Sequence, residues 1–303
     1  MDTSTTGHLV PTIDPAIATD DATFGAAHLE VTDLDRSLTF WVGLIGLRLL
    51  ERSGTVARLG VGAKELLVLH AVADGPARRG HTGLYHVALH LPDEPEFARI
   101  LGRLIRSGHR IGPTDHTFSK AIYLSDPDGL GLELTLETPE LMRVFELSDA
   151  GIRVVDVHGR ERTPSDPLDI AAVMATLGDG DLAQPLPTGT RIGHLHLHVA
   201  DLAVTQRFYL DLGLTPEVYA PGLGAAHFSA GGPFKHRLAT NTWQGAGATP
   251  APAGSARMRH FELVYDGPAR LDAAMRHLGI EAVDGSALVR DPSGTAVRLS
   301  SRT

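Results

Sequence analysis

One stretch decides the fold expected for this chain: His116-Thr-Phe-Ser-Lys-Ala-Ile-Tyr123-Leu-Ser-Asp-Pro-Asp-Gly-Leu-Gly-Leu-Glu133. Its Asp-Pro-Asp-Gly sequence consists of turn-forming residues and lies between two apolar runs, so it predicts a hairpin of two short strands. Side chains alternate between the two faces of a strand, so Tyr123 and Glu133 can both point into one cavity. The alternative is an ordinary hairpin with a solvated glutamate.

Internal repeats predict the architecture around this hairpin. The segment His28-Leu-Glu-Val-Thr-Asp33 recurs as His196-Leu-His-Val-Ala-Asp201, and in each an alternating strand leads to an aspartate placed to cap a helix. A second pair of repeats starts near 85 and 259, with helices expected over 94–107 and 269–279. The fold class predicted is α+β, with four βαβββ modules paired into two domains, each a curved mixed sheet around a cavity with helices outside.

The repeats also divide the chain. We expect a flexible N-terminal tail over 1–22, an N-terminal domain with the metal site over 23–137, a linker with a short helix over 138–189, and a C-terminal structural domain over 190–303. This division assumes that consecutive modules pair with each other. The linker is rich in Pro, Gly and charged residues, which favours partial order.

Composition narrows the function classes. The chain has 303 residues, 43% of them hydrophobic, and a net charge of −9. No Lys/Arg cluster favours nucleic acid or an anionic membrane. The absence of cysteine excludes disulfides, thiolate ligands and cysteine nucleophiles. No stretch approaches the roughly 20 apolar residues of a membrane span, and the first 22 residues do not resemble a signal peptide, so we expect a cytoplasmic protein.

The spacing of His116, Tyr123 and Glu133 around Asp-Pro-x-Gly resembles the signature of extradiol ring-cleavage dioxygenases. These enzymes belong to the vicinal-oxygen-chelate superfamily, which includes glyoxalases and bleomycin resistance proteins. Over about residues 24–303 the chain resembles catechol 2,3-dioxygenase-like proteins, which implies two vicinal-oxygen-chelate domains. The phrases that carry the resemblance are Gly83-Leu-Tyr-His86, Leu124-Ser-Asp-Pro-Asp-Gly129, Arg191-Ile-Gly-His194-Leu-His196 and Thr240-Asn-Thr-Trp243.

The resemblance implies metal ligands on the first and last strands of the modules, which in the N-terminal half are His28, His86 and Glu133. Two imidazoles and one carboxylate leave three open positions on an octahedral ion and suit Fe(II) with O₂, with Mn(II) as the alternative. The same ligand types also hold zinc. Taken singly, each histidine can equally be a half-buried core residue.

The C-terminal half carries an arginine where the carboxylate should be. His196 and His260 stand at the equivalent first-strand positions, but Arg298 matches Glu133, and a guanidinium cannot ligate a cation. We therefore expect this half to be structural. Metal binding through His196, His236 and His260 is the remaining option.

Other histidines stay ambiguous. His70 can be a fourth ligand, an acid/base group or a solvent-facing strand end. His194 and His198 alternate with His196 on one face of a strand and could face the cavity or the core.

By family analogy, His116 transfers a proton and Tyr123 hydrogen-bonds the charged ring oxygen. Their structural alternatives are a turn cap and a packed ring. The resemblance implies an extradiol dioxygenase that inserts O₂ into a catechol next to its hydroxyls. Its partners would be a small aromatic diol and O₂, and we expect a homodimer or tetramer. The alternatives are another metal-dependent enzyme of this fold, such as a glyoxalase-type isomerase, lyase or tailoring enzyme, and a metal-free binding or resistance protein.

Overall fold

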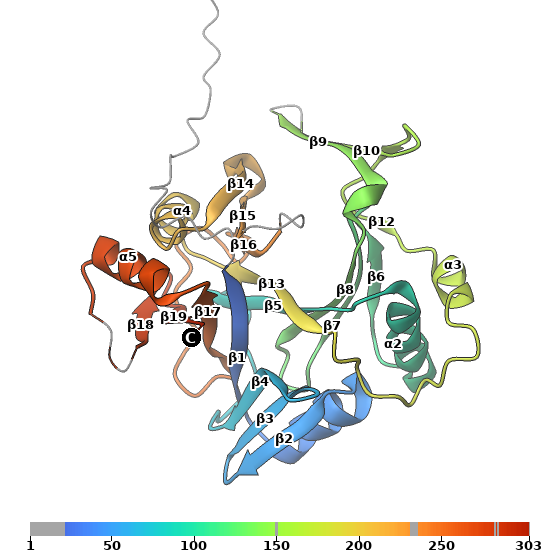
Figure 1. The fold of residues 1–303 in the computed structure, drawn as a ribbon, viewed down its shortest axis with the longest axis horizontal. Coiled ribbons are helices and arrows are strands. Elements are labelled where there is room, and N and C mark those ends of the chain that lie inside the picture. Colours follow the sequence, from blue (N-terminus) through green and yellow to red (C-terminus); the bar gives the residue numbers. More distant parts are fainter. Residues whose placement is uncertain (1–21, 149–150, 231–235, 282, 284, 303) are drawn as a thin grey trace, which may run out of the picture.

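The computed structural model describes residues 22–302 except 149–150, 231–235, 282 and 284 (Figure 1). Residues 1–21 of the expected tail lie outside this range. Each module begins with a strand and a helix and continues into further strands. The first contains β1 (Thr23–Val31), α1 (Leu34–Leu38), the π-helical η1 (Thr39–Ile45), β2 (Arg48–Ser53), β3 (Val56–Val61) and β4 (Lys64–Ala71). The second contains β5 (Gly83–His90), α2 (Glu94–Ser107), β6 (Gly112–Asp115), β7 (Ser119–Ser125) and β8 (Gly131–Glu137).

The third and fourth modules follow the same order. The third contains β13 (Arg191–His198), α4 (Leu202–Asp211), β14 (Thr215–Ala220), the 3-10 helix η3 (Pro221–Leu223), β15 (Ala225–Ser229) and β16 (Leu238–Asn241). The fourth contains β17 (Arg257–Tyr265), α5 (Pro268–Leu278), β18 (Ala287–Arg290) and β19 (Ala296–Ser301). The α+β class and the four-module repeat are thus confirmed, although the described part of the fourth module has two strands after its helix where three were predicted.

The helix starts follow the predicted caps. The Asp33 side chain accepts a hydrogen bond from the Arg36 backbone N–H, and Asp201 accepts from the Ala203 and Val204 N–H groups. Each aspartate satisfies backbone donors that the first helical turn leaves free. Both expected later helices are present as α2 and α5.

The modules pair in an order that differs from the expected one. The first and fourth modules form a seven-stranded sheet, β18-β19-β17-β1-β4-β3-β2, called sheet I below. The second and third form a nine-stranded sheet, β12-β6-β7-β8-β5-β13-β16-β15-β14, called sheet II. Each sheet therefore takes one module from either side of the linker, whereas we expected consecutive modules to pair. All four first strands carry the same alternating pattern, so the pattern alone does not say which of them pair.

The segment between the second and third modules, expected to be a partly ordered linker, contains short strands and helices. It carries η2 (Pro139–Leu141), β9 (Met142–Ser148), β10 (Gly151–Asp156), β11 (Glu161–Arg162), β12 (Asp166–Pro167) and α3 (Ile170–Ala175). β9, β10 and β11 form a small separate sheet, and β12 extends sheet II beside β6. The short helix lies where it was expected.

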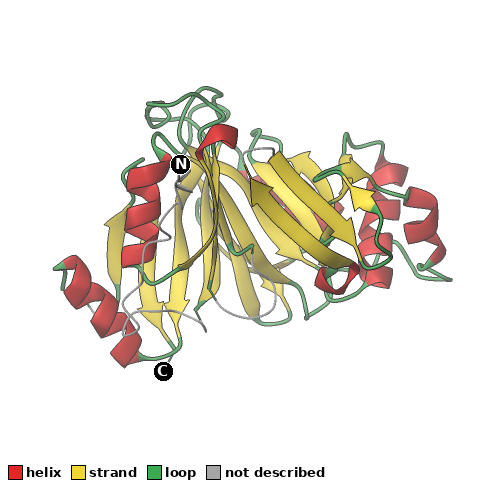
Figure 2. Cartoon of the chain, turned by 90° about the horizontal axis from the view of Figure 1, so that it is seen from above, coloured by secondary structure: helices red, strands yellow, loops and turns green. Residues whose placement is uncertain are grey.

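Helices lie outside the strands and bury one face of each sheet, as Figure 2 shows. In α2, the side chains of Phe97, Leu101 and Leu104 are fully buried. Each such side chain stabilises the fold by about 1.5–3 kcal/mol. The opposite faces of the central strands are free to carry polar side chains.

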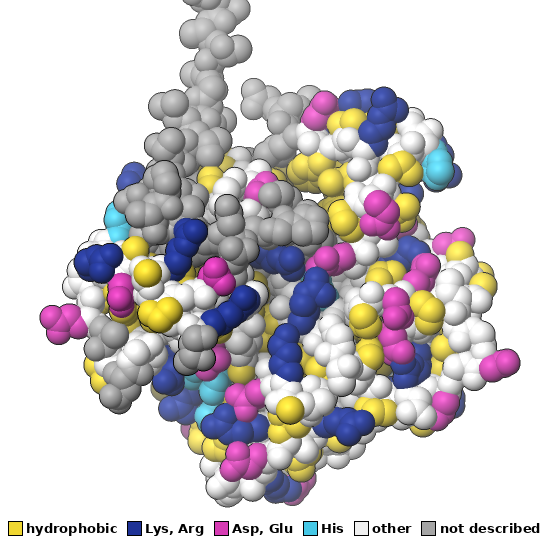
Figure 3. All heavy atoms as spheres, viewed as in Figure 1, with side chains coloured by type: hydrophobic (Ala, Val, Ile, Leu, Met, Phe, Trp, Pro, Cys, Tyr) yellow, Lys and Arg dark blue, Asp and Glu magenta, His cyan; other side chains and the backbone are white. Residues whose placement is uncertain are grey.

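On the face seen in Figure 3, Lys and Arg side chains are interspersed with Asp and Glu side chains. Within the described part of the chain, no helix is both long and apolar enough to cross a membrane.

Candidate metal centre

Three buried side chains of sheet II converge on one point. His86 comes from β5, Glu133 from β8 and His194 from β13. The Nε2 atoms of His86 and His194 lie 3.2 Å apart, and Glu133 Oε2 lies 3.0 Å from the first and 3.1 Å from the second. An octahedral ion with bonds of about 2.1 Å holds neighbouring ligand atoms about 3.0 Å apart. The spacing of these three atoms therefore fits one face of such an ion.

Strand register explains this convergence. β5 lies between β8 and β13, and Ala88 of β5 is opposite both Glu133 and His194. His86 lies two residues from Ala88 and therefore points to the same face. A small alanine at the centre leaves space for the three longer side chains around it.

A β-bulge at Gly193 aligns His194. Ile192 pairs with Leu89 and His194 with Ala88, so Gly193 is an extra residue in β13. A Cβ atom on Gly193 would lie 2.0 Å from Cγ of His90. Only glycine leaves room there for the His90 ring.

His90 holds the other nitrogen of His194. His90 Nε2 lies 2.7 Å from His194 Nδ1, and His90 Nδ1 lies 2.6 Å from Glu137 Oε1. A carboxylate only accepts hydrogen bonds, so His90 Nδ1 donates and its Nε2 must accept. His194 therefore donates from Nδ1, which leaves a lone pair on Nε2 facing the other two ligand atoms. Such an outer partner orients a metal-binding histidine and fixes its tautomer.

Charges around Glu137 stabilise this chain of hydrogen bonds. Arg191 and Arg237 both form ion pairs with Glu137. Burial alone would raise the pKa of Glu137, but the hydrogen bond from His90 and the two guanidinium groups lower that pKa to about 2. Burial lowers the pKa of His90, which favours its neutral form.

The cluster presents its ligands in the form that binds cations. Burial alone would raise the pKa of Glu133, but the imidazoles of His194 and His86 hold it well below its usual range. Burial lowers the pKa of His194 to about 4. A carboxylate oxygen and an imidazole lone pair that face each other at 3.1 Å repel unless a positive charge lies between them. The residues present therefore fit a divalent metal.

His28 does not join this cluster. The structure brings His86 and Glu133 together as the sequence predicts, but His28 lies on β1 in sheet I, where its Nδ1 is 3.1 Å from Nε2 of His70. His194 takes the third place. From the sequence, His194 could face a cavity. Because consecutive modules were assumed to pair, that cavity was expected in the C-terminal domain and not beside His86 and Glu133.

His116 and Tyr123 form a hydrogen-bonded pair beside the cluster. His116 Nδ1 lies 2.7 Å from the carbonyl oxygen of Pro164, so it donates, and its Nε2 accepts from the Tyr123 hydroxyl at 2.9 Å. The Tyr123 ring centroid is 5.6 Å from that of His86. Burial, together with the charge of Glu133, raises the pKa of Tyr123 well above 10. The phenol is therefore a proton donor at neutral pH.

A cavity of about 880 Å³ borders the cluster, with His86, Tyr85, Tyr123, His198 and Gln244 in its lining. Tyr85 reaches this face because it is the extra residue of a second bulge, between the pairs His86–His196 and Leu84–Leu197. A drug-sized or smaller ligand fits such a volume.

Asn241 connects His196 with His198, a histidine of the cavity wall. Its Nδ2 lies 2.8 Å from His196 Nε2, and its Oδ1 lies 2.7 Å from His198 Nδ1. His236 also borders the site, with its ring centroid 4.6 Å from that of His194. The set His196, His236 and His260 is not assembled, because His260 belongs to sheet I. The phrase Thr240-Asn-Thr-Trp243 of the resemblance contains Asn241, but the sequence assigned no role to this residue.

Known proteins place the chain in a family. Residues 23–134 match the model of the Glyoxalase/Bleomycin resistance protein/Dioxygenase superfamily. A catechol-2,3-dioxygenase of Bacillus subtilis is 34% identical over 284 residues, which cover 90% of this chain and 95% of that protein. A putative dioxygenase of Bacillus subtilis has a similar structure, with a TM-score of 0.56, 14% identity and coverage of 92% of this chain and 85% of that one. Glyoxalase I from Zea mays aligns with a TM-score of 0.53, 17% identity and coverage of 92% of both chains.

The chain belongs to the Glyoxalase/Bleomycin resistance protein/Dioxygenase superfamily. Within it, the chain is a member of the family of the Bacillus catechol-2,3-dioxygenase, which confirms the resemblance stated from the sequence and the enzyme class expected, an extradiol dioxygenase. The two solved structures show that the fold is shared.

Proposed function

We propose that this enzyme opens the ring of a catechol next to its hydroxyls with O₂, using Fe(II) held by His86, His194 and Glu133. The observation that carries the proposal is the mutual spacing of the three ligand atoms, 3.0–3.2 Å, on a buried face. Two histidines and one carboxylate on one face leave three positions open, as Fe(II) oxygenases require. Bound Fe(II) would supply sites for both reactants and a path for electrons between them. Mn(II) is the alternative ion, since it accepts the same ligand types.

Tyr123 and His116 move the proton that a catechol loses on binding. The Tyr123 hydroxyl donates to His116 Nε2, and its own oxygen remains free to accept. A substrate hydroxyl that donates to Tyr123 can therefore pass a proton along this pair to His116. The hydrogen bond from His116 Nδ1 to Pro164 fixes the tautomer that makes Nε2 the acceptor.

The pair also returns a proton. Once His116 is charged, Tyr123 can donate to the ring oxygen on which negative charge develops. His116 is half-buried in the turn between β6 and β7, so its proton can exchange with solvent. Both roles agree with the family analogy.

The cavity provides the binding surface for an aromatic ring. Tyr85 lies between His86 and Trp243, with ring centroids 4.8 Å and 5.7 Å from theirs. Aromatic walls favour a flat apolar ligand. A small aromatic diol with O₂ is thus the proposed substrate pair. A homodimer or tetramer and a cytoplasmic location stay predictions from the sequence.

Anaerobic reconstitution tests the proposal. Metal-free protein is loaded with Fe(II), or with Mn(II) in parallel, mixed with catechol and then exposed to O₂. We expect one O₂ consumed per yellow ring-opened product. Replacement of exposed His277 by Ala should leave the rate unchanged. A protein that binds the metal but consumes no O₂ with a panel of catechols would refute the proposal.

A further inference from the structure

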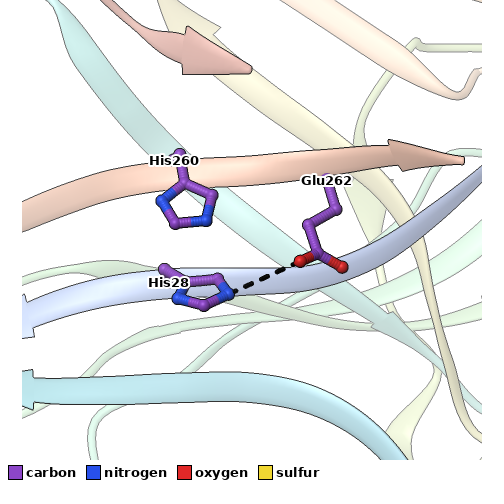
Figure 4. A group of neighbouring side chains, drawn as sticks. All are labelled: His28, His260 and Glu262. Atoms are coloured by element: carbon purple, nitrogen blue, oxygen red, sulfur yellow. Dashed lines mark ion pairs between the residues drawn. The ribbon is translucent and has the colours of Figure 1, made fainter. Parts of the chain in front are cut away.

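We propose that sheet I carries a second divalent-cation site, separate from the catalytic one and built from His28, His260 and Glu262. Figure 4 shows His28 on β1 facing His260 and Glu262 on the neighbouring strand β17. Their ligand atoms all lie within 4.8 Å of one another. The proposal does not depend on the dioxygenase reaction.

The register of sheet I places these residues opposite one another. His28 pairs with His260 across β1 and β17, just as His196 pairs with His86 across β13 and β5. The rings of His28 and His260 stack with centroids 3.9 Å apart. The site therefore lies in sheet I at the place that the catalytic centre occupies in sheet II, with His260 matching His86 and His28 matching His196.

His28 has one nitrogen anchored and one available. Its Nδ1 lies 3.1 Å from Nε2 of His70. His70 occupies on β4 the register position that Asn241 occupies on β16. An outer partner on Nδ1 leaves Nε2 as the ligand atom, as His90 does for His194. His28 Nε2 lies 3.7 Å from Glu262 Oε1.

Glu262 is held in the same way. The Ala26 backbone N–H donates to Oε2 at 3.2 Å, which leaves Oε1 facing His28. A Cβ atom on Gly25 would lie 2.3 Å from Oε2, so glycine at this position makes room for the carboxylate. The carboxylate is therefore seated by the backbone beside it.

Two nitrogens in this cluster are buried without a hydrogen-bond partner among the described residues, Nε2 of His28 and Nε2 of His260. Burying a polar atom without a partner costs free energy, so such atoms call for an explanation. A cation bound between these nitrogens and Glu262 Oε1 would satisfy both of them.

Two of the nearby arginines, Arg298 and Arg58, are engaged outside the site. Arg298 is exposed, and its Nη2 lies 3.2 Å from Ser286 Oγ. Arg58 forms ion pairs with Glu51 and Glu65. These charges weaken cation binding relative to the catalytic centre without filling the site.

The ligand spacing favours zinc. A tetrahedral ion with bonds of about 2.1 Å separates its ligand atoms by about 3.4 Å, against about 3.0 Å for an octahedral one. The 3.7 Å between His28 Nε2 and Glu262 Oε1 is closer to the tetrahedral value. Two imidazoles, one carboxylate and a water are a known zinc ligand set. Because β1 and β17 belong to the first and fourth modules, bound zinc would cross-link these two modules.

Metal titration tests the site. Tag-free, metal-free protein is titrated with Zn²⁺ under competition with a chelating dye, and its melting temperature is recorded with and without Zn²⁺. We expect two equivalents bound by the wild type and one by Glu262→Gln, which keeps the side-chain volume. His260→Ala should also bind one, His194→Ala should bind one, and the double variant His194→Ala/His260→Ala none.

The controls separate this site from the catalytic one. Glu262→Gln should keep the Fe(II)-dependent O₂ uptake of the wild type and lose the stabilisation that the second equivalent of Zn²⁺ provides. His277→Ala should behave as the wild type. A wild type whose bound Zn²⁺ is lost entirely in His194→Ala, or two equivalents in folded Glu262→Gln and His260→Ala, would overturn the proposal, whatever the enzymatic assay shows.

Discussion

Sheets I and II are built on the same register and differ at the positions that face the metal. Both central strand pairs carry a bulge at a glycine, Gly25 in β1 and Gly193 in β13. Where sheet II has His194, two residues before His196, sheet I has Ala26, two residues before His28. Two sheets of the same geometry can thus carry different ligand sets.

The position of the carboxylate also differs between the two sheets. In sheet II, Ala88 is opposite Glu133, and in sheet I Glu262 is opposite Arg298. A glutamate on the last strand is replaced by arginine, and a carboxylate appears instead on the first strand. The same fold therefore keeps a tight triad in one pair of modules and a wider cluster in the other.

The largest effect is expected from removing the triad member that the sequence did not select. His194→Ala should lower turnover by at least on the order of 10³-fold, because loss of a direct ligand exceeds the 10–100-fold cost of losing an outer partner. His28→Ala should retain turnover, since it lies in sheet I. Steady-state O₂ uptake with metal analysis measures both. If His28→Ala abolished turnover while His194→Ala kept it, the sheet II triad would be the wrong one.

Tyr123→Phe is expected to cost on the order of 10²-fold in turnover if its hydroxyl acts like one donor to a charged oxygen. The aromatic ring is kept, so the metal content should not change. In sheet I the matching residue opposite Arg298 is Leu288, which has no hydroxyl. Single-turnover rates at saturating catechol separate the proton step from binding. Full turnover in Tyr123→Phe would exclude this role.

Much of this comparison could be predicted from sequence. The repeats and the turn chemistry of residues 126–129 predicted the modules, and Arg298 indicated that one copy lacks a carboxylate on its last strand. Which modules pair with each other could not be predicted, because β1, β5, β13 and β17 share one alternating pattern. The register of strand pairs also depends on contacts between residues distant in sequence. Because of that one error, the sequence grouped His28 with His86 and Glu133, whereas the structure brings His194 to them. Bulges are also invisible to a two-residue period, so the cavity-facing Tyr85 was missed.

The glycine bulge of sheet II can be tested by adding one methyl group. Gly193→Ala should lower metal affinity by about 10–100-fold, because the new Cβ displaces His90 from His194. Gly222→Ala is the matched control, since a Cβ there meets nothing within 4 Å. Metal titration of both variants measures the difference. Equal affinities would show that His90 does not orient the ligand.

The smallest effect concerns Glu137, which has no acidic counterpart in sheet I. Its folded-state pKa of about 2 lies below the ordinary value of 4.5. Its contribution to stability is therefore fully present above pH 4.5 and is lost as pH falls from 4.5 towards 2. We expect a loss of about 2 kcal/mol across this window in the wild type, and a smaller loss in Glu137→Gln. Urea unfolding of metal-free protein at several pH values measures both slopes. Parallel slopes would mean that His90, Arg191 and Arg237 do not stabilise the ionised carboxylate, so the outer support of His194 would have to come from elsewhere.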